Sequence, residues 1–168
     1  MRFIGKVDVL ALGFRGGVNA FMSMGKNYGV DIDETLATET VRNYRRANKR
    51  IVGLWRAMND GVMDVVGRTI KTKTVGQLLI NLEDDWLTVR LPSGRKLTYY
   101  KPLNEDHENS GRIKTTFMGV GFNRKFMRID TYGGKIVENV TQAVARDVLG
   151  ANLSVIEAAG YEIVATVH

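Results

Sequence analysis

Residues 86–100 read Trp86-Leu87-Thr88-Val89-Arg90-Leu91-Pro92-Ser93-Gly94-Arg95-Lys96-Leu97-Thr98-Tyr99-Tyr100. Two runs rich in apolar, β-branched and aromatic residues flank a Pro-Ser-Gly turn, which is the pattern of a β-hairpin. An apolar run at 78–82 precedes the hairpin, and strand-like stretches at 113–120 and 126–132 follow it. Residues 102–111 are mostly polar and predict a loop. The middle of the chain is therefore predicted to be rich in β-strands.

Helical patterns flank this region on both sides. Helices are predicted at 2–12, 18–26, 34–66 and 135–158, the third with a break near 49 or 60 left open, and a strand is predicted at 161–167. Asp33 is the predicted N-cap of the third helix. Spacings of three and four predict one buried apolar stripe along that helix, made of Val41, Tyr44, Ala47, Ile51, Trp55 and Met58. The predicted fold class is α+β.

Composition narrows the function without deciding it. The chain has 168 residues, a net charge of +6 and no cysteine, which excludes disulfides and Cys-based metal sites. No apolar run approaches the roughly 20 residues that span a bilayer, so no membrane association is expected. Residues 1–60 carry ten Lys/Arg against six Asp/Glu. A basic excess of this kind suits a polyanionic partner but does not require one.

The first predicted helix carries two cations on one face. Arg2 and Lys6 are four residues apart, and Leu10 and Phe14 continue the same row. Two cations so placed could bind phosphates, because Arg and Lys stabilise charge on a transferring phosphoryl group. Leu10 and Phe14 would then contact a sugar and a base. The alternative is a solvated face followed by a core Leu and Phe.

The last predicted helix carries a narrow polar stripe, made of Lys135, Asn139, Gln142 and Arg146. Apolar residues occupy the opposite side: Ile136, Val137, Val140, Val144 and Val148. Donors in such a stripe could bind the acceptors that every base pair presents in the minor groove, and so hold a duplex without reading its sequence. The alternative is the solvated face of an ordinary amphipathic helix.

Two further features are less specific. A basic cluster lies opposite the predicted apolar stripe and consists of Arg42, Arg45, Arg46, Lys49 and Arg50. Such a cluster is usually a solvated face, with nucleic-acid contact as the alternative. The glycines between Gly13 and Gly17 follow a predicted helix rather than a strand and lack the Gly-Lys-Ser/Thr ending. A Walker-type phosphate loop is therefore excluded there.

Three segments, taken in order, resemble family A DNA polymerases, the bacterial DNA polymerase I class, and in particular its phage-encoded branch. The row from Arg2 to Phe14, followed by Gly16-Gly17, is similar to motif B, the fingers helix of that family. The stretch from Glu138 to Asp147, preceded by Asp130-Thr131-Tyr132-Gly133-Gly134-Lys135, resembles the palm helix that holds the primer–template minor groove. Residues 160–168 resemble the strand that enters motif C, whose signature is His-Asp-Glu. The resemblance covers nearly the whole chain.

This resemblance implies a role for each matching residue. Arg2 and Lys6 would bind the triphosphate of the incoming nucleotide. Leu10 stands where the family usually has the Phe or Tyr that faces the sugar, and Phe14 where it has the Tyr near the template base. Residues implied to contact primer–template DNA are Lys135, Asn139, Gln142, Arg146 and His168. Where the family often has Asn, four residues before the Gln, this chain has Glu138.

The resemblance also implies a two-metal mechanism in the complete enzyme, with Mg²⁺ held by an Asp of motif A and an Asp of motif C. Asp8, Asp130 and Asp147 do not match either position. The chain by itself is therefore expected to bind dNTP and primer–template DNA without catalysing nucleotidyl transfer. A split gene, an intein or intron junction, or an incomplete reading frame would each explain this, and the missing polymerase segments are its expected partners.

Three segments are expected: a fingers-like helical segment at 1–70, a β-hairpin-rich connection at 71–132, and part of a palm at 133–168. A phage-encoded polymerase would work in the host cytoplasm during DNA replication. Two rival functions stay open at this point. One is a noncatalytic nucleic-acid-binding module, and the other is an unrelated α+β structural protein with a basic surface.

Overall fold

The computed structural model describes residues 2–106 and 111–166, apart from the side chains of residues 2–4. The helices of this part of the chain are α1 (Arg2–Leu12), α2 (Val18–Asn27), α3 (Glu34–Ala47), α4 (Lys49–Val66) and α5 (Gly133–Ala158). Its strands are β1 (Thr72–Val75), β2 (Leu78–Glu83), β3 (Trp86–Arg90), β4 (Lys96–Asp106), β5 (Ile113–Val120) and β6 (Phe126–Thr131). The fold is α+β, as predicted.

The strands form one antiparallel sheet in chain order, β1 to β6. The predicted hairpin is the β3–β4 pair, in which Trp86 faces Tyr100 and Arg90 faces Lys96. Its turn closes through two hydrogen bonds, donated by the Leu91 N–H to the Arg95 carbonyl and by the Gly94 N–H to the Leu91 carbonyl. Gly94 has φ +87°, a conformation that glycine adopts without a Cβ penalty.

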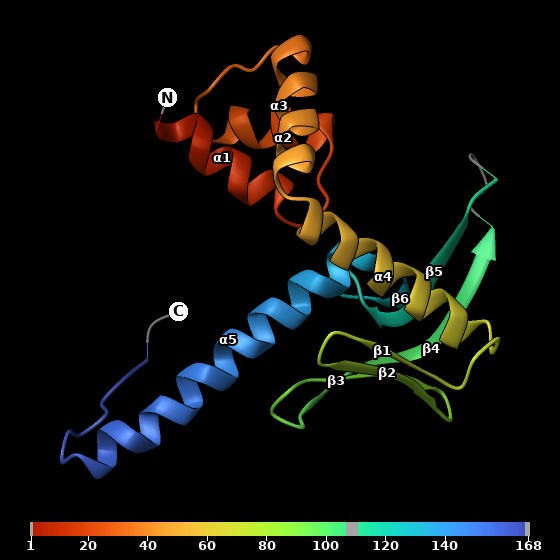
Figure 1. Ribbon diagram of the computed structural model, residues 1–168, viewed down its shortest axis with the longest axis vertical. Helices are drawn as coiled ribbons and strands as arrows, with labels where there is room; N and C mark the ends of the chain where they lie inside the picture. Colours follow the sequence, from red (N-terminus) through yellow and green to blue (C-terminus); the bar gives the residue numbers. More distant parts are fainter. Residues whose placement is uncertain (1, 107–110, 167–168) are drawn as a thin grey trace.

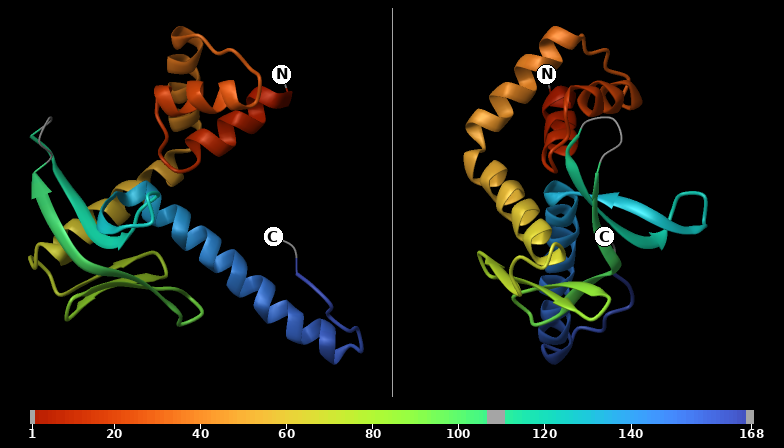
Figure 2. Two further views of the ribbon diagram at one scale, coloured as in Figure 1. Left: turned by 180° about the vertical axis from the view of Figure 1, so that it is seen from behind. Right: turned by 90° about the vertical axis from the view of Figure 1, so that its right-hand side faces the viewer.

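The helices form two groups around two hydrophobic cores. The helices α1, α2 and α3 enclose a first core that includes Val7, Phe21 and Val41. The second core combines α4, the sheet and α5, so it draws on all three segments expected from the sequence. Figure 1 shows α4 leading from the first group to the sheet, while α5 begins beside it and extends well past the sheet. Figure 2 shows the first group at the end of α4 that is remote from the sheet.

Two predicted elements are wrong within the described residues. Residues 102–106 are not a loop, because β4 continues through them to Asp106. Their polar side chains find partners: Asn104 donates from Nδ2 to the Met63 carbonyl and accepts at Oδ1 from the Thr115 hydroxyl. Residues 161–166 contain no strand. An isolated segment pairs into a strand only where a neighbouring strand is available to it.

The prediction of one continuous buried apolar stripe along residues 34–66 is also wrong. The helix breaks at Asn48, whose side-chain amide donates to the Tyr44 carbonyl. Val41 therefore packs in the first core, whereas Trp55 and Met58 pack in the second. Ala47 and Ile51, on either side of the break, are exposed. The predicted N-cap at Asp33 is confirmed, since its Oδ1 accepts from the Leu36 N–H at 2.8 Å.

The helix α5 is fixed against the sheet near its middle by Asp147. Its carboxylate accepts from the Ser93 hydroxyl at 2.6 Å and from Arg95 Nε at 2.7 Å. The Ser93 hydrogen bond, and then the Arg95 guanidinium, lower the pKa of Asp147. Beyond this point α5 leaves the sheet, and Val148 is 58% exposed. The apolar side predicted for this helix is therefore buried from Ile136 to Val140 but not at Val148.

The helices α4 and α5 cross in direct backbone contact at Gly133. A Cβ atom at this position would lie 2.0 Å from the Trp55 carbonyl oxygen and 2.7 Å from the Asn59 nitrogen. The Gly133 N–H donates to Asn59 Oδ1 at 3.2 Å, which satisfies one free donor at the start of α5. Glycine is required here by the close approach of the two backbones.

Asp8 is an unfavourable charge at the edge of the first core. Its Oδ1 is buried and has no hydrogen-bond partner among the described residues. Burial raises the pKa of Asp8, and burial together with the Asp8 charge raises the pKa of Tyr44. An ionised carboxylate without a partner in such a place destabilises the folded state.

None of the helices in the described part of the chain is long and apolar enough to cross a membrane.

The crossing at Gly133 gives a first prediction. Gly133→Ala should destabilise the protein by about 3 kcal/mol, because the new methyl group forces the α4 and α5 backbones apart. Gly150→Ala, in the same helix, meets no atom within 4 Å and should stabilise by up to about 1 kcal/mol through helix propensity. Urea unfolding monitored by circular dichroism measures both. Equal effects of the two changes would contradict the close crossing.

Asp8 gives a second prediction. The pKa of Asp8 is higher in the folded state than in the unfolded state. The loss of stability caused by its buried charge is therefore absent below the unfolded-state pKa and complete above the folded-state pKa. Asp8→Asn should therefore raise Tm at pH 7, by roughly 2–4 °C for a cost of about 1 kcal/mol, and have little effect near pH 3. The exposed Asp31→Asn is the matched control and should change Tm little at either pH. A gain that is the same at both pH values would rule out the charge as its cause.

Candidate nucleotide and DNA interface

Two members of the predicted phosphate-binding row, Lys6 and Leu10, lie on the outer face of α1. Lys6 is exposed, with its Nζ 5.2 Å from the centre of the ring of Tyr28, the residue directly after α2. Leu10 is 43% exposed, whereas Val7 on the inner face is fully buried. Leu10 is therefore not a core residue, which contradicts the alternative in which it packs in the core. The side chain of Arg2 lies outside the described part of the chain.

Phe14 lies just beyond the end of α1, in the turn that leads to α2, and is half-buried. The backbone here packs against the start of α5. A Cβ atom at Gly134 would lie 2.6 Å from the Phe14 carbonyl oxygen and 2.5 Å from the Arg15 Cβ. Arg15 also lies over the ring of Tyr132, with its Cζ 5.8 Å from the ring centre. Two of the predicted site segments, about 120 residues apart in sequence, therefore meet at this junction.

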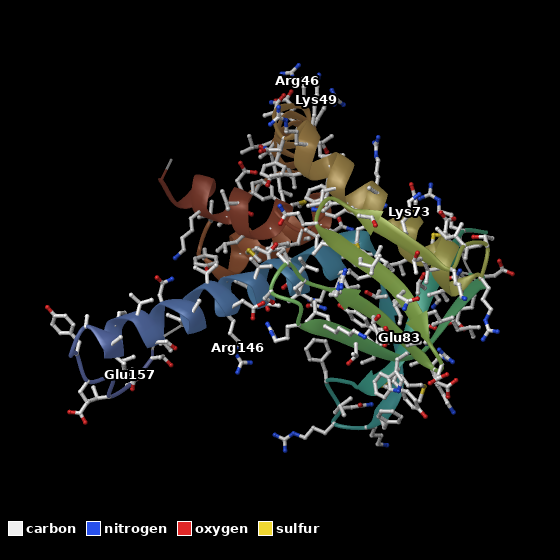
Figure 3. The ribbon with its side chains drawn as sticks, turned by 60° about the horizontal axis from the view of Figure 1, so that its bottom comes forward. Arg46, Lys49, Lys73, Glu83, Arg146 and Glu157 are labelled. Carbon is white, nitrogen blue, oxygen red and sulfur yellow. The ribbon has the colours of Figure 1, made fainter. Side chains whose placement is uncertain are left out.

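The polar stripe of α5 divides into members with different surroundings. Gln142 and Arg146 are exposed. Figure 3 shows Arg146 projecting from the side of α5. Lys135 is exposed too, but its Nζ lies 2.9 Å from Glu138 Oε2 in an ion pair. Gln142 Nε2 donates weakly to the other oxygen of Glu138 at 3.4 Å. His168 lies outside the described residues.

Asn139 differs from its neighbours because a core residue already binds it. Its Nδ2 donates to the Tyr99 hydroxyl at 3.0 Å, and the side chain is partly buried. Burial raises the pKa of Tyr99, and the hydrogen bond from Asn139 opposes that rise. Tyr99 is 5% exposed, so this pair satisfies a hydroxyl that would otherwise be buried alone. Asn139 is therefore more a positioning residue for α5 than a free donor on its surface.

Glu138 also lies on this surface of α5, although the predicted polar stripe did not include it. It stands three residues after Lys135 and four before Gln142, and it contacts both. This spacing was readable from the sequence, because residues three and four apart are neighbours on a helix. Glu138 places a negative charge next to two predicted DNA contacts, so the α5 surface becomes more basic from Lys135 towards Arg146.

The basic cluster on α3 and α4 is exposed throughout: Arg42, Arg45, Arg46, Lys49 and Arg50. Figure 3 shows Arg46 and Lys49 projecting from the junction of the two helices. Arg45 donates from Nη2 to the Gly16 carbonyl at 3.2 Å, which ties α3 to the turn after α1. Within the described residues, the cluster makes no ion pair with a carboxylate. It is a positive surface at the junction of α3 and α4, joined to the turn after α1 through Arg45.

The described residues contain no group of three His, Asp or Glu side chains that could hold a metal ion. Two of the three aspartates considered for a metal site are engaged elsewhere: Asp147 binds Ser93 and Arg95, and Asp130 pairs with Lys114 at 3.1 Å. The residues present therefore do not fit a two-metal centre by themselves.

Over all 168 residues the chain is 39% identical to a DNA polymerase of Bacillus phage SP02, and it spans 26% of the length of that protein. No protein-family model matches the chain. No solved structure matches it either. The chain is therefore related, along its full length, to about a quarter of a phage DNA polymerase.

Proposed function

We propose that this chain forms the nucleotide-binding and primer–template-binding part of a family A DNA polymerase. The parent reaction is the template-directed transfer of a nucleotidyl group from a dNTP to a primer 3′-OH. The observation that supports this most is the junction at Gly134, where the end of the α1 row meets the start of α5. The 39% sequence identity to a phage DNA polymerase, over the full length of this chain, supports the same reaction class.

The α1 row has the properties that a nucleotide site needs. Lys6 is an exposed cation for the triphosphate, and Leu10 offers an exposed apolar surface one turn later. A positively charged group that acts on the transferring phosphoryl group lowers the barrier because charge develops there. Phe14 follows at the end of the helix, next to the start of α5. Arg2 belongs to the same proposed row.

The duplex-binding surface that we propose on α5 centres on Gln142 and Arg146. Both side chains are exposed. Arg146 forms no ion pair within the described residues, and Gln142 donates only weakly to Glu138, at 3.4 Å. Lys135 contributes less, because Glu138 offsets its charge. Asn139 contributes through the position of the helix, because Tyr99 occupies its donor. His168 is proposed to approach the primer end.

Mg²⁺ enters the proposal only as a requirement of the complete polymerase. Bound Mg²⁺ would stabilise the attacking and leaving oxygens of the transfer. The described residues do not hold it, so we propose that other parts of the polymerase do. The roles proposed for this chain are to bind the triphosphate, to place the sugar and base, and to hold the duplex.

The decisive experiment replaces the homologous segment of the phage SP02 polymerase with this chain and measures primer extension. The chimaera should extend primers, and Lys6→Ala within it should lower the rate on the order of 10²-fold or more, the usual effect of removing one such donor. Duplex affinity should change little. Lys26→Ala, an exposed lysine of the neighbouring helix, is the control and should leave the rate unchanged. An inactive chimaera that still folds, or equal effects of the two changes, would reject the proposal.

A further prediction tests the α5 surface. Gln142→Ala in the same chimaera should slow extension from a matched primer end about fivefold to tenfold, since one lost hydrogen bond costs roughly 1 kcal/mol. The ratio of matched to mismatched extension should also change, because a mismatch displaces the minor-groove acceptors that this residue contacts. Asn152→Ala, further along α5 and also exposed, is the control. An unchanged ratio with full activity would leave α5 as an ordinary amphipathic helix.

A further inference from the structure

Three aromatic rings form a row on the face of the sheet that is turned away from α4 and α5. Trp86 of β3 and Tyr100 of β4 are paired residues with ring centres 4.7 Å apart, and the ring of Phe126 in β6 continues the row at 6.4 Å from Tyr100. The neighbouring Leu87 and Tyr99 lie in the second core, so the alternation of side chains along a strand places the row on the opposite face. These three residues are termed the aromatic row.

The aromatic row is open to solvent at both of its ends. Trp86 is 43% exposed and Phe126 is 60% exposed. Val120, which faces Phe126 across the β5–β6 hairpin, is 68% exposed. Figure 2 shows the β5–β6 turn projecting beyond the rest of the sheet. Large aromatic side chains gathered on a surface mark a site of protein interaction, because Trp and Tyr supply much of the binding energy of interfaces.

The two ends of the aromatic row carry opposite charges. Asp84 and Asp85 directly precede Trp86, and Arg124 and Lys125 directly precede Phe126. All four charged side chains are exposed, and none of them forms an ion pair within the described residues. The surface therefore has an acidic end and a basic end, with the aromatic row between them.

The charged side chains between these ends already have partners within the chain. Arg128 donates from Nη1 to the Lys101 carbonyl and to the Thr116 hydroxyl, each at 3.1 Å. The Nζ of Lys101 lies 5.4 Å from the centre of the middle ring of the row. Glu83 is paired with Lys96 at 2.7 Å. The unpaired charges at the two ends are therefore the ones that select a partner.

The order of these charges limits which partner fits the whole surface. A nucleic acid or an acidic peptide would bring its negative charges against Asp84 and Asp85, and a basic peptide would meet Arg124 and Lys125. A matching partner has an aromatic surface with the same charges in the reverse order. A second copy of this chain, rotated about a two-fold axis, presents that order, since a two-fold axis places each end of the surface against the other end of its copy.

We propose that the aromatic row is the centre of a symmetric dimer interface of this chain. The two-fold axis passes close to Tyr100, the middle ring, so that Asp84 and Asp85 of each copy face Arg124 and Lys125 of the other. The rings are buried in the centre and the charges form the rim, which is the usual arrangement of a protein interface. The inference is independent of the proposed function, because neither the α1 row nor the polar stripe of α5 belongs to this surface.

The test is sedimentation equilibrium of the 168-residue chain and of two variants with exchanged charges. The unaltered chain should dimerise at concentrations on the order of 10 μM, the weak end of the range for interfaces of ordinary size. Asp84→Asn/Asp85→Lys makes both ends basic, and Arg124→Asn/Lys125→Glu makes both ends acidic. Asn is used at residues 84 and 124 because their φ angles are +52° and +59°, a region that Asn tolerates.

Each variant alone should dimerise at least about tenfold more weakly, because like charges then face each other across the two-fold axis. An equimolar mixture of the two variants should recover dimers, because every charged end then meets an end of opposite sign. Asp31→Asn/Glu39→Lys changes the net charge by the same amount at two exposed positions remote from the sheet, and should leave the dimer intact. Circular dichroism melting confirms that each variant is folded.

Tryptophan fluorescence places the interface on the aromatic row. The chain has two tryptophans, of which Trp55 is buried in the second core and Trp86 is exposed. Quenching by acrylamide should therefore fall as the protein concentration rises through the dimerisation range, and Trp86→Phe should abolish that fall. Trp86→Ala should weaken dimerisation about tenfold or more, as expected for a central aromatic residue of an interface.

Four outcomes would overturn the dimer. They are a chain that stays monomeric at about 100 μM, well above the expected range; a mixture of the exchanged variants that does not associate; a control that weakens association as much as they do; and growth beyond dimers, which an interface closed by a two-fold axis does not permit. A single-stranded oligonucleotide that protects Trp86 from acrylamide while the chain stays monomeric would assign the row to nucleic acid and overturn it as well. None of these outcomes bears on the effect of Lys6→Ala, which tests the proposed function.

Discussion

The structure depends on one constraint, the close packing of the start of α5, at Gly133 against α4 and at Gly134 against the turn after α1. A side chain at Gly133 would overlap the Trp55 carbonyl, and one at Gly134 would overlap the Phe14 carbonyl oxygen and the Arg15 Cβ. Because neither residue has a Cβ, the start of α5 fits between α4 and the turn that follows α1. This packing completes the second hydrophobic core. It also brings together the two proposed binding surfaces, the α1 row and the polar stripe of α5.

Polar contacts then fix α5 along its first half. Asn59 accepts from the Gly133 N–H, Tyr99 accepts from Asn139, and Asp147 binds the β3–β4 turn through Ser93 and Arg95. These bonds place the helix against the sheet without using Gln142 or Arg146, which are left to face outward. A surface intended to bind a duplex needs this separation, because a donor that is satisfied inside the protein gains little from a new partner.

Local chemistry explains why much of the fold and part of the site could be predicted. Two runs of strand-forming residues around Pro92-Ser93-Gly94 predicted a hairpin, and the Asp33 cap marked where α3 begins. For residues 102–106 the local pattern was misleading, because their polar side chains predicted a loop. They lie in β4 because Asn104 finds partners at Met63 and Thr115, which are distant in sequence and invisible to any local pattern.

The sequence by itself determined the α+β class, the positions of most helices and strands, and the one-faced rows of α1 and α5, because helical and strand spacing is a local property of the chain. Only the tertiary structure decided that Leu10 is exposed, that Asn139 is bound by Tyr99, and that Phe126 lies beside Tyr100. These facts depend on which distant segments pack together. That packing is set by close contacts such as Gly133 against Trp55, which residue spacing does not encode.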